Sequence, residues 1–333
     1  MFRIIAFWPI RAGGRLATLA LCAGVLVTGP LAFAQTAYPL RPLHLVVPFP
    51  AGGAADLVAR ALCEPLAQAI GQPVVVDNKP GVDGVAAAEF VAKAAPDGYT
   101  LFMATYGAMS AAPWLHRTLP YDPERDFTPV AGVGSFSYFL FAHPQLPIHN
   151  VAELETYILQ HPGQLNFGTG NAGALVLASE WAKARHLLLN PIPYKGEVPA
   201  MADFLAGRID LMIATPSNTL APVREGKLRA LLAMQERRSA LLPEVPSLPE
   251  ADMVATSVQM WAGVFAPAGL PSAIRDRLAQ ALQSVLLRPA LQTEFARQGF
   301  EPHPSGPGPL RTLLQHQLSA WQRAVAQAGL EAQ

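Results

Sequence analysis

The chain has 333 residues, with 24 Lys and Arg against 24 Asp and Glu, so its formal net charge is zero. A chain without excess positive charge attracts polyanions poorly, which argues against nucleic acid as a partner. At this length we expect the chain to divide into two domains.

The first 34 residues have the pattern of a cleavable export signal. They contain three arginines and no acidic residue, an apolar run at 16–27, and an A-x-A cleavage site at 32–34. The apolar run is too short to span a bilayer, which disfavours the alternative of an N-terminal anchor. Cleavage after Ala34 would leave 21 basic and 24 acidic residues, a net charge of −3. Only Cys63 would remain of the two cysteines, so we expect no internal disulfide.

Apolar, strand-like runs alternate with helical stretches along the rest of the chain. The expected strands are 43–47, 73–76, 100–104, 164–167, 209–213 and 228–234. The expected helices are 54–70, 85–95, 173–185, 198–206, 271–287, 289–298 and 308–328. This alternation predicts an α/β fold with mainly parallel sheets that are covered by helices on both faces.

Two stretches have the features of connections between domains. Residues 128–141 form an apolar, glycine-containing run between prolines, and residues 227–234 lead into a polar turn. If both stretches cross, lobe 1 is discontinuous and comprises residues 35–130 and 240–333. Lobe 2 then comprises residues 131–239.

A glycine-containing turn at residues 48–56 joins the first expected strand to the first expected helix. A buried strand, a sharp turn and a helix start bring several backbone N–H groups to one point, at the positive end of the helix dipole. Gly52 and Gly53 let a ligand approach the backbone, so the turn suits a carboxylate or phosphate. On these local features, an ordinary strand–helix turn in which Asp56 serves only the helix end is an equal alternative.

A second glycine-rich turn formally matches the dinucleotide fingerprint G-x-G-x-x-G, with Gly168, Gly170 and Gly173. The preceding strand is short and polar, and no acidic residue lies about 20 positions on to hold a ribose, so the context argues against a dinucleotide. We interpret the turn as a second anion-binding helix start, where Thr169 and Asn171 add side-chain donors.

Three more loops follow expected strands, at residues 105–107, 193–196 and 215–218. In open α/β sheets, ligands bind beyond the carboxyl ends of strands. Five such ends are rich in Gly, Thr, Ser, Asn and Tyr and come from both domains. They predict a ligand cleft between the two lobes.

Catalytic and metal-binding motifs are absent from the sequence. It contains no G-x-S-x-G, H-E-x-x-H or C-x-x-C, and no two of the eight histidines pair at ligand spacing on one helix. Cys63 lies among Ala and Leu in an expected helix, which favours a buried structural thiol. We therefore expect no catalytic residue, no metal and no cofactor, and a binding protein rather than an enzyme.

A series of motifs runs in order along nearly the whole chain after residue 34. It includes PFPAGGAAD at 48–56, DNKPG at 77–81, PDGYTL at 96–101, YDP at 121–123, PYKG at 193–196 and FAPAG at 265–269. In these motifs the chain resembles the Bug receptor family, the extracytoplasmic solute-binding proteins of tripartite tricarboxylate transporters. The resemblance implies a two-lobed α/β fold like that of type II periplasmic binding proteins, with a hinged cleft that closes on a small carboxylate-bearing ligand.

The resemblance also implies which positions hold the ligand. The first-lobe loop would bind one carboxylate, partly through ordered waters, and the second-lobe turn would face it. Together with the strand-end loops, the candidate ligand-binding residues are Phe49, Gly52, Gly53, Asp56, Thr105, Tyr106, Gly107, Gly168, Thr169, Gly170, Gly173, Tyr194, Gly196, Thr215 and Asn218. The chain departs from the family pattern at Glu197, where a small residue is common, and at Ala174, where a hydroxyl residue is frequent. The ligand therefore need not be a familiar dicarboxylate.

We accordingly expect a monomeric periplasmic receptor that captures a small organic acid. It would deliver the acid to the membrane subunits, one large and one small, of a tripartite tricarboxylate-type transporter. A periplasmic ligand sensor that acts on a sensor kinase is the alternative, because it would use the same cleft.

Overall fold

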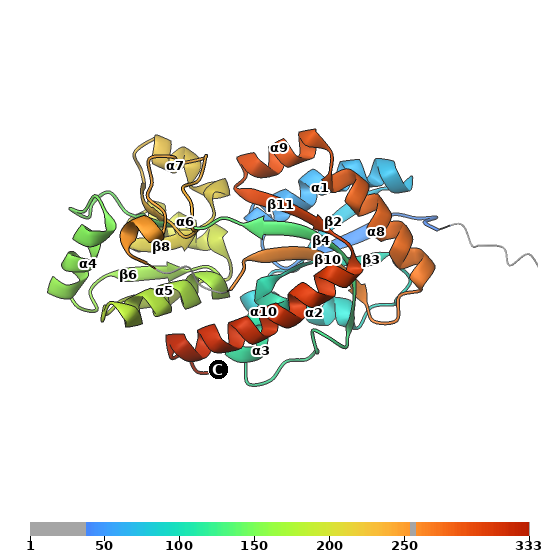
Figure 1. The fold of residues 1–333 in the computed structure, drawn as a ribbon, viewed down its shortest axis with the longest axis horizontal. Coiled ribbons are helices and arrows are strands. Elements are labelled where there is room, and N and C mark those ends of the chain that lie inside the picture. Colours follow the sequence, from blue (N-terminus) through green and yellow to red (C-terminus); the bar gives the residue numbers. More distant parts are fainter. Residues whose placement is uncertain (1–37, 254–257, 333) are drawn as a thin grey trace, which may run out of the picture. The chain divides into compact units, whose positions relative to one another are not determined.

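The computed structural model describes residues 38–253 and 258–332 (Figure 1). The predicted export signal at residues 1–34 lies outside the described residues. From Pro39 onward, the described chain builds two β-sheets, each flanked by helices. We call the parts of the molecule built on these sheets the first and the second lobe.

The first lobe is built on a six-stranded sheet in the order β11-β4-β10-β3-β1-β2. Its strands are β1 (Leu43–Val47), β2 (Val74–Asn78), β3 (Thr100–Thr105), β4 (Phe127–Phe136), β10 (Trp261–Pro267) and β11 (Phe300–Ser305). The interior strand β1 is the apolar run LHLVV, and four of its five residues are fully buried because helices cover both faces. These helices are α1 (Ala54–Ile70), α2 (Val85–Ala92), α8 (Ser272–Leu286), α9 (Pro289–Arg297) and α10 (Pro307–Ala328).

The second lobe is built on a five-stranded sheet in the order β7-β6-β8-β5-β9. Its strands are β5 (Phe139–Ala142), β6 (Asn166–Thr169), β7 (Asn190–Pro193), β8 (Leu211–Ala214) and β9 (Arg229–Ala233). Its helices are α4 (Val151–Gln160), α5 (Ala172–Ala184), α6 (Glu197–Leu205) and α7 (Leu220–Arg224), which surround the sheet in Figure 1. The fully buried rings of Phe139, Phe141 and Phe204 form part of its core.

The predicted α/β class is confirmed, but both sheets are mixed rather than mainly parallel. In the first sheet β1 pairs in parallel with β2 and β3, whereas β10 runs antiparallel to β3 and β4, and β11 antiparallel to β4. In the second sheet β5 runs antiparallel to both neighbours. The connections between the lobes explain these antiparallel pairs. Strands β5 and β10 begin at the side of their lobe that faces the other lobe, whereas their neighbours β8 and β3 end at that side, so the two directions are opposite.

The first crossing between the sheets is very short, because β4 ends at Phe136 and β5 begins at Phe139. The return crossing follows β9 and leads to β10. We propose that residues 35–130 and 240–333 form the first lobe and that residues 131–239 form the second. Strand β4 belongs to the first sheet as far as Phe136, so the first crossing lies a few residues after position 131.

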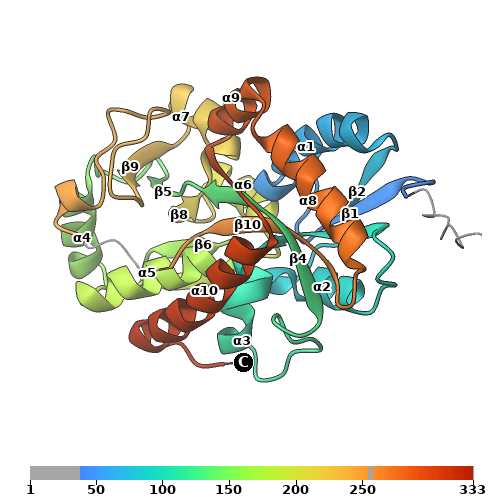
Figure 2. The same ribbon diagram turned by 45° about the vertical axis from the view of Figure 1, so that its right-hand side comes forward.

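The C-terminal helix α10 contacts β4 of the first lobe and α5 of the second, and Figure 2 shows α10 and α5 side by side. Short helical turns complete the described chain: η1 (Val82–Gly84), η2 (Gly107–Ala111), α3 (Ala112–Leu115), η3 (Pro216–Asn218) and η4 (Pro249–Ala251). Among the described residues, no helix combines the length and the apolar composition that crossing a membrane requires.

Candidate functional site

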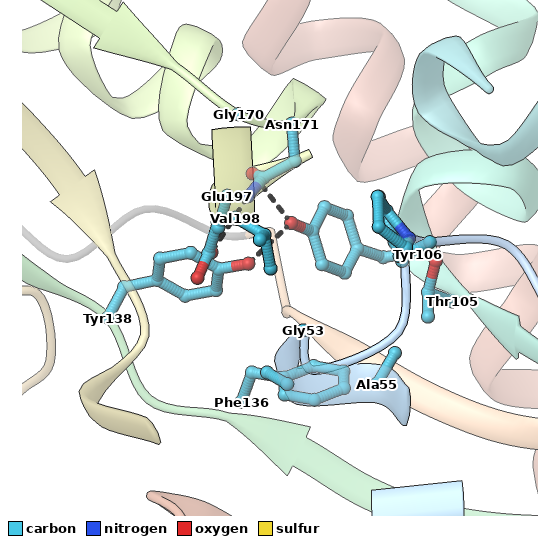
Figure 3. Close-up of a pocket in the computed structure, with 13 residues that line it drawn as sticks. Gly53, Ala55, Thr105, Tyr106, Phe136, Tyr138, Gly170, Asn171, Glu197 and Val198 are labelled. Atoms are coloured by element: carbon cyan, nitrogen blue, oxygen red, sulfur yellow. Dashed lines mark hydrogen bonds between the residues drawn. The ribbon is translucent and has the colours of Figure 1, made fainter. Parts of the chain in front are cut away.

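A pocket lies where the ends of strands from both sheets meet (Figure 3). It has a volume of about 30 Å³ in this conformation, which is room for water molecules only. Most of its wall is apolar or aromatic, as is usual for small-molecule sites. The lining residues are Phe49, Pro50, Gly53, Ala54, Ala55, Thr105, Tyr106, Phe136, Tyr138, Gly170, Asn171, Glu197 and Val198.

The first-lobe wall of the pocket contains the N-terminus of α1. Gly53 is the N-cap residue of α1 and has no side chain that could cap the helix. The amides of Ala54 and Ala55, in the first turn, therefore have no acceptor within the helix and none from the N-cap side chain. Gly52 has φ +80°, a left-handed conformation that glycine adopts without strain. Uncapped amides at the positive end of a 17-residue helix favour a bound anion.

Asp56 lies beneath this loop, outside the pocket lining, and holds the loop in shape. It is 1% exposed, and its Oδ2 accepts hydrogen bonds from the Gly52 amide (2.9 Å) and from Arg60 Nε (2.8 Å). Asn78 Nδ2 donates both to Asp56 Oδ1 (2.9 Å) and to the carbonyl oxygen of Phe49 (3.0 Å). Burial alone would raise the pKa of Asp56, but the hydrogen bonds from Arg60, Gly52 and Asn78 outweigh burial and lower it.

The Thr105 hydroxyl, at the end of β3, is a polar group of the pocket that lacks a partner. Thr105 is 1% exposed, and within the described part of the chain its Oγ1 makes no hydrogen bond. An unsatisfied buried hydroxyl costs about 1–3 kcal/mol. A ligand oxygen bound in the pocket would recover this energy.

Glu197 is the first residue of α6 and brings a buried carboxyl group to the second-lobe wall. It is 8% exposed, and its Oε2 accepts from the Thr215 amide (3.2 Å) and the Thr215 hydroxyl (2.6 Å). Its Oε1 accepts from Asn171 Nδ2 (3.1 Å), and the Tyr138 hydroxyl is a further hydrogen-bond partner. Burial raises the pKa of Glu197 above its ordinary value, against the opposing effect of these hydrogen bonds.

Tyr106 joins the two lobes across the pocket. Its hydroxyl donates to Asn171 Oδ1 (2.9 Å) and lies 2.9 Å from the Tyr138 hydroxyl, and the two tyrosine rings point toward each other in Figure 3. Its ring stacks on Trp321 of α10, with 5.3 Å between ring centroids. A Cβ at Gly173 would lie 2.7 Å from the Tyr106 oxygen, so this glycine makes room for the tyrosine.

The structure brings five of the residues predicted from sequence into the pocket wall: Phe49, Gly53, Thr105, Tyr106 and Gly170. Four others support it from behind: Gly52 and Asp56 shape the first-lobe loop, Gly173 accommodates Tyr106, and Thr215 binds Glu197. Gly196 (φ +115°) borders the first-lobe loop, since a Cβ there would lie 2.9 Å from Pro50 Cδ.

The remaining predicted residues have other surroundings. Thr169 and Tyr194, with Gly196, line an adjacent groove, and the Thr169 hydroxyl donates to the carbonyl oxygen of Ile192 (3.3 Å). A Cβ at Gly168 would lie 2.3 Å from Ile209 Cδ1, so this glycine serves packing. Gly107 and Asn218 also lie outside the pocket lining: Gly107 packs against the Asp83 backbone, and Asn218 has a buried Nδ2 without a partner in the described chain.

Sequence reasoning does not select several lining residues, of which Glu197 and Tyr138 contribute the most polar contacts. In the sequence, Glu197 stands out only as a departure from a family pattern, and Tyr138 lies within the stretch 128–141 that we interpret as a crossing. Each of these two sequence features identifies a segment that reaches the pocket, but neither predicts the hydrogen bonds that Glu197 and Tyr138 make there. Asn171, expected as a donor to the ligand, is the N-cap of α5, where its Oδ1 accepts from the Ala174 amide (2.9 Å), and its Nδ2 donates to Glu197 (3.1 Å).

Neither a metal centre nor a reactive thiol emerges from the described residues. They contain no group of three or more His, Cys, Asp or Glu side chains that could hold a metal ion. Cys63 is half-buried, and burial raises its pKa to about 11, so the thiol stays protonated at neutral pH.

Comparison with known proteins gives consistent matches. Residues 58–330 match the family described as "Tripartite tricarboxylate transporter family receptor". Protein BugT of Bordetella pertussis is 32% identical over 88% of this chain and 90% of its own length. The structure of periplasmic binding protein BugD is 33% identical and superposes with a TM-score of 0.84 over 89% of this chain and all of its own. The R. palustris protein Rpa4515, solved with adipate, is 29% identical and superposes with a TM-score of 0.86 over the same shares.

Proposed function

Because the chain belongs to the tripartite tricarboxylate transporter receptor family, which includes the Bug proteins, we propose that it is a periplasmic receptor for a small organic acid. It captures the acid through a carboxylate and delivers it to the membrane subunits of a tripartite tricarboxylate-type transporter. The observation that carries this proposal is the pairing, in one pocket, of the uncapped α1 N-terminus with the unpartnered Thr105 hydroxyl.

The carboxylate is held without a full positive charge. Ala54, Ala55 and Thr105 line the same pocket, and their amides and hydroxyl are hydrogen-bond donors on one lobe. Helix-end amides are already fixed in place and partly desolvated, so they avoid the cost of burying a Lys or Arg side chain without a partner. An acid such as the adipate bound by Rpa4515 carries the group that this arrangement suits.

Capture is coupled to closure of the lobes. The pocket is narrow in this conformation, with a volume of about 30 Å³, so the acid must enter while the lobes are apart. Tyr106, Asn171 and Tyr138, which contact one another across the pocket here, are placed to close around the ligand. A ligand that contacts both lobes stabilises the closed state by its differential affinity for that state.

Thermal shift and titration calorimetry with a panel of organic acids test the proposal. An acid that binds with a Kd of about 1 μM adds about 2.7 kcal/mol of stability at a hundredfold excess over Kd. This corresponds to a rise in Tm of roughly 5 °C for a chain of this size. If no acid in the panel shifts the Tm or gives a binding isotherm, the proposed function is wrong.

Gly53→Val is the matching variant. Gly53 has φ −75°, which any residue adopts, and a Cβ there would lie 3.2 Å from the Pro50 carbonyl oxygen and 4.0 Å from Val198 Cγ2 on the opposite wall. We expect the valine to fill the pocket and abolish the ligand-induced shift, and to cost the free protein about 1 kcal/mol as a poorer N-cap residue. Gly308→Val in the first turn of α10, where a Cβ meets nothing within 4 Å, is the control and should bind normally.

A further inference from the structure

The hydrogen-bond donors of the second-lobe wall converge on a side chain of the protein itself. The amide and hydroxyl of Thr215 and the Nδ2 of Asn171 all point at the Glu197 carboxyl group, with Tyr138 as a fourth partner. A carboxylate has about four acceptor sites, and the donors of Thr215 and Asn171 fill three of them. The donors are therefore already occupied and are not free for an anionic group of a ligand.

This wall also has no cation to balance a second negative charge. None of the described residues that line the pocket is Lys, Arg or His, and Glu197 is their only ionisable carboxyl group. A dicarboxylate with one end at the α1 N-terminus would place its other end against Glu197. When Glu197 is ionised, the two like charges repel in this buried, water-poor site. When Glu197 is protonated, the site still disfavours a buried negative charge and offers no cation to the ligand's second carboxylate.

The rest of the pocket suits an uncharged ligand body. Phe49, Phe136 and Val198 line the same pocket as the α1 N-terminus and Glu197. Burial of apolar ligand surface against these groups adds affinity without any polar requirement.

We propose that the Glu197 side chain takes the place of a ligand's second carboxylate, so that this receptor selects acids with a single carboxylate over dicarboxylates. The preferred ligand has an apolar or aromatic body, and its far end is apolar or carries an N–H or O–H donor. This inference rests on the proposed function and narrows its ligand class.

Calorimetric titration with matched acid pairs tests the inference. Hexanoate against adipate, and benzoate against terephthalate, differ within each pair by one carboxylate on the same skeleton. We expect the wild-type protein to bind the monoacid at least tenfold more tightly than the diacid in every pair that binds. Glu197→Gln, which keeps the shape and removes the charge, should reduce this preference at least fivefold.

Glu197→Ala gives a stronger form of the test. It frees Thr215, Asn171 and Tyr138 for a ligand carboxylate, so we expect diacid affinity to rise at least tenfold relative to the monoacid. The control is Glu153→Gln, because Glu153 also lies in the first turn of a helix, α4, but away from the pocket. Its ratio of monoacid to diacid affinity should equal that of the wild type.

The outcomes separate the two proposals. If the wild type binds diacids as tightly as monoacids, or if both Glu197 variants keep the wild-type ratio, the inference is overturned while the receptor function stands. If neither monoacids nor diacids bind to any of these proteins, both proposals fall. The wild-type comparison needs no variant, so a folding defect in Glu197→Ala does not block the test.

Discussion

Replacing Asp56 with Asn should loosen the first-lobe loop without changing the size of the side chain. The amide keeps one acceptor oxygen but turns an N–H₂ group toward Arg60 Nε and the Gly52 amide, or toward Asn78 Nδ2, so donors would face donors. Hydrogen bonds to a charged group are worth about 1.5–3 kcal/mol each. Because Arg60 is half exposed, its contribution is screened and we discount it. We expect a loss of about 2–3 kcal/mol of unfolding free energy.

Chemical denaturation monitored by tryptophan fluorescence measures this loss, which corresponds to a fall in Tm of roughly 5 °C. Acid affinity should also fall, because Asn78 and Gly52 set the shape of the loop that presents the α1 amides. Asp77→Asn is the control: Asp77 is ion-paired with Lys79 but is partly exposed, so the change should cost less than about 0.5 kcal/mol. Equal losses in the two variants would refute the role assigned to Asp56.

Three further predictions concern closure and the buried acid. Tyr106→Phe removes the hydroxyl contacts across the pocket and should weaken acid binding by about 1 kcal/mol, or roughly fivefold, whereas Tyr121→Phe, also buried but outside the pocket, should bind normally in calorimetry. Gly196→Ala forces a residue with φ +115° to carry a Cβ 2.9 Å from Pro50 Cδ, so small-angle X-ray scattering with ligand should show incomplete compaction; full compaction would contradict this. The folded-state pKa of Glu197 is raised, so its stabilising contribution is present below about pH 4.5 and is lost as pH rises through the folded-state pKa. The Tm advantage of Glu197→Gln over the wild type should therefore grow as pH rises above about 4.5. A constant difference would contradict that sign.

Local signals made the first-lobe strand–turn–helix unit predictable. The apolar run and the glycines fix β1 at 43–47 and α1 at 54–70, and the structure has both elements at these residues. The strand β11 was not predicted, because its sequence FEPHPS has two prolines and no apolar alternation. It is tolerated because it lies at the edge of the sheet, where proline removes no pairing on the open side.

The loops of the candidate site could be predicted from the sequence, but the contacts between them could not. The glycines at 52, 53 and 170 identify loops that bend near a ligand, since this property depends on local backbone conformation. The contacts of Glu197 depend on three other segments, around Tyr138, Asn171 and Thr215, which approach it only in the folded chain. No pattern along the sequence shows such an approach.

A crystal structure of the protein with a bound organic acid tests the central claim most directly. We predict that the ligand carboxylate lies about 3 Å from the amide nitrogens of Ala54 and Ala55 and from Thr105 Oγ1, with no Lys or Arg side chain in contact. A carboxylate that is paired with the Lys195 ammonium, or that binds outside the pocket, would contradict the claim that main-chain dipoles hold the acid.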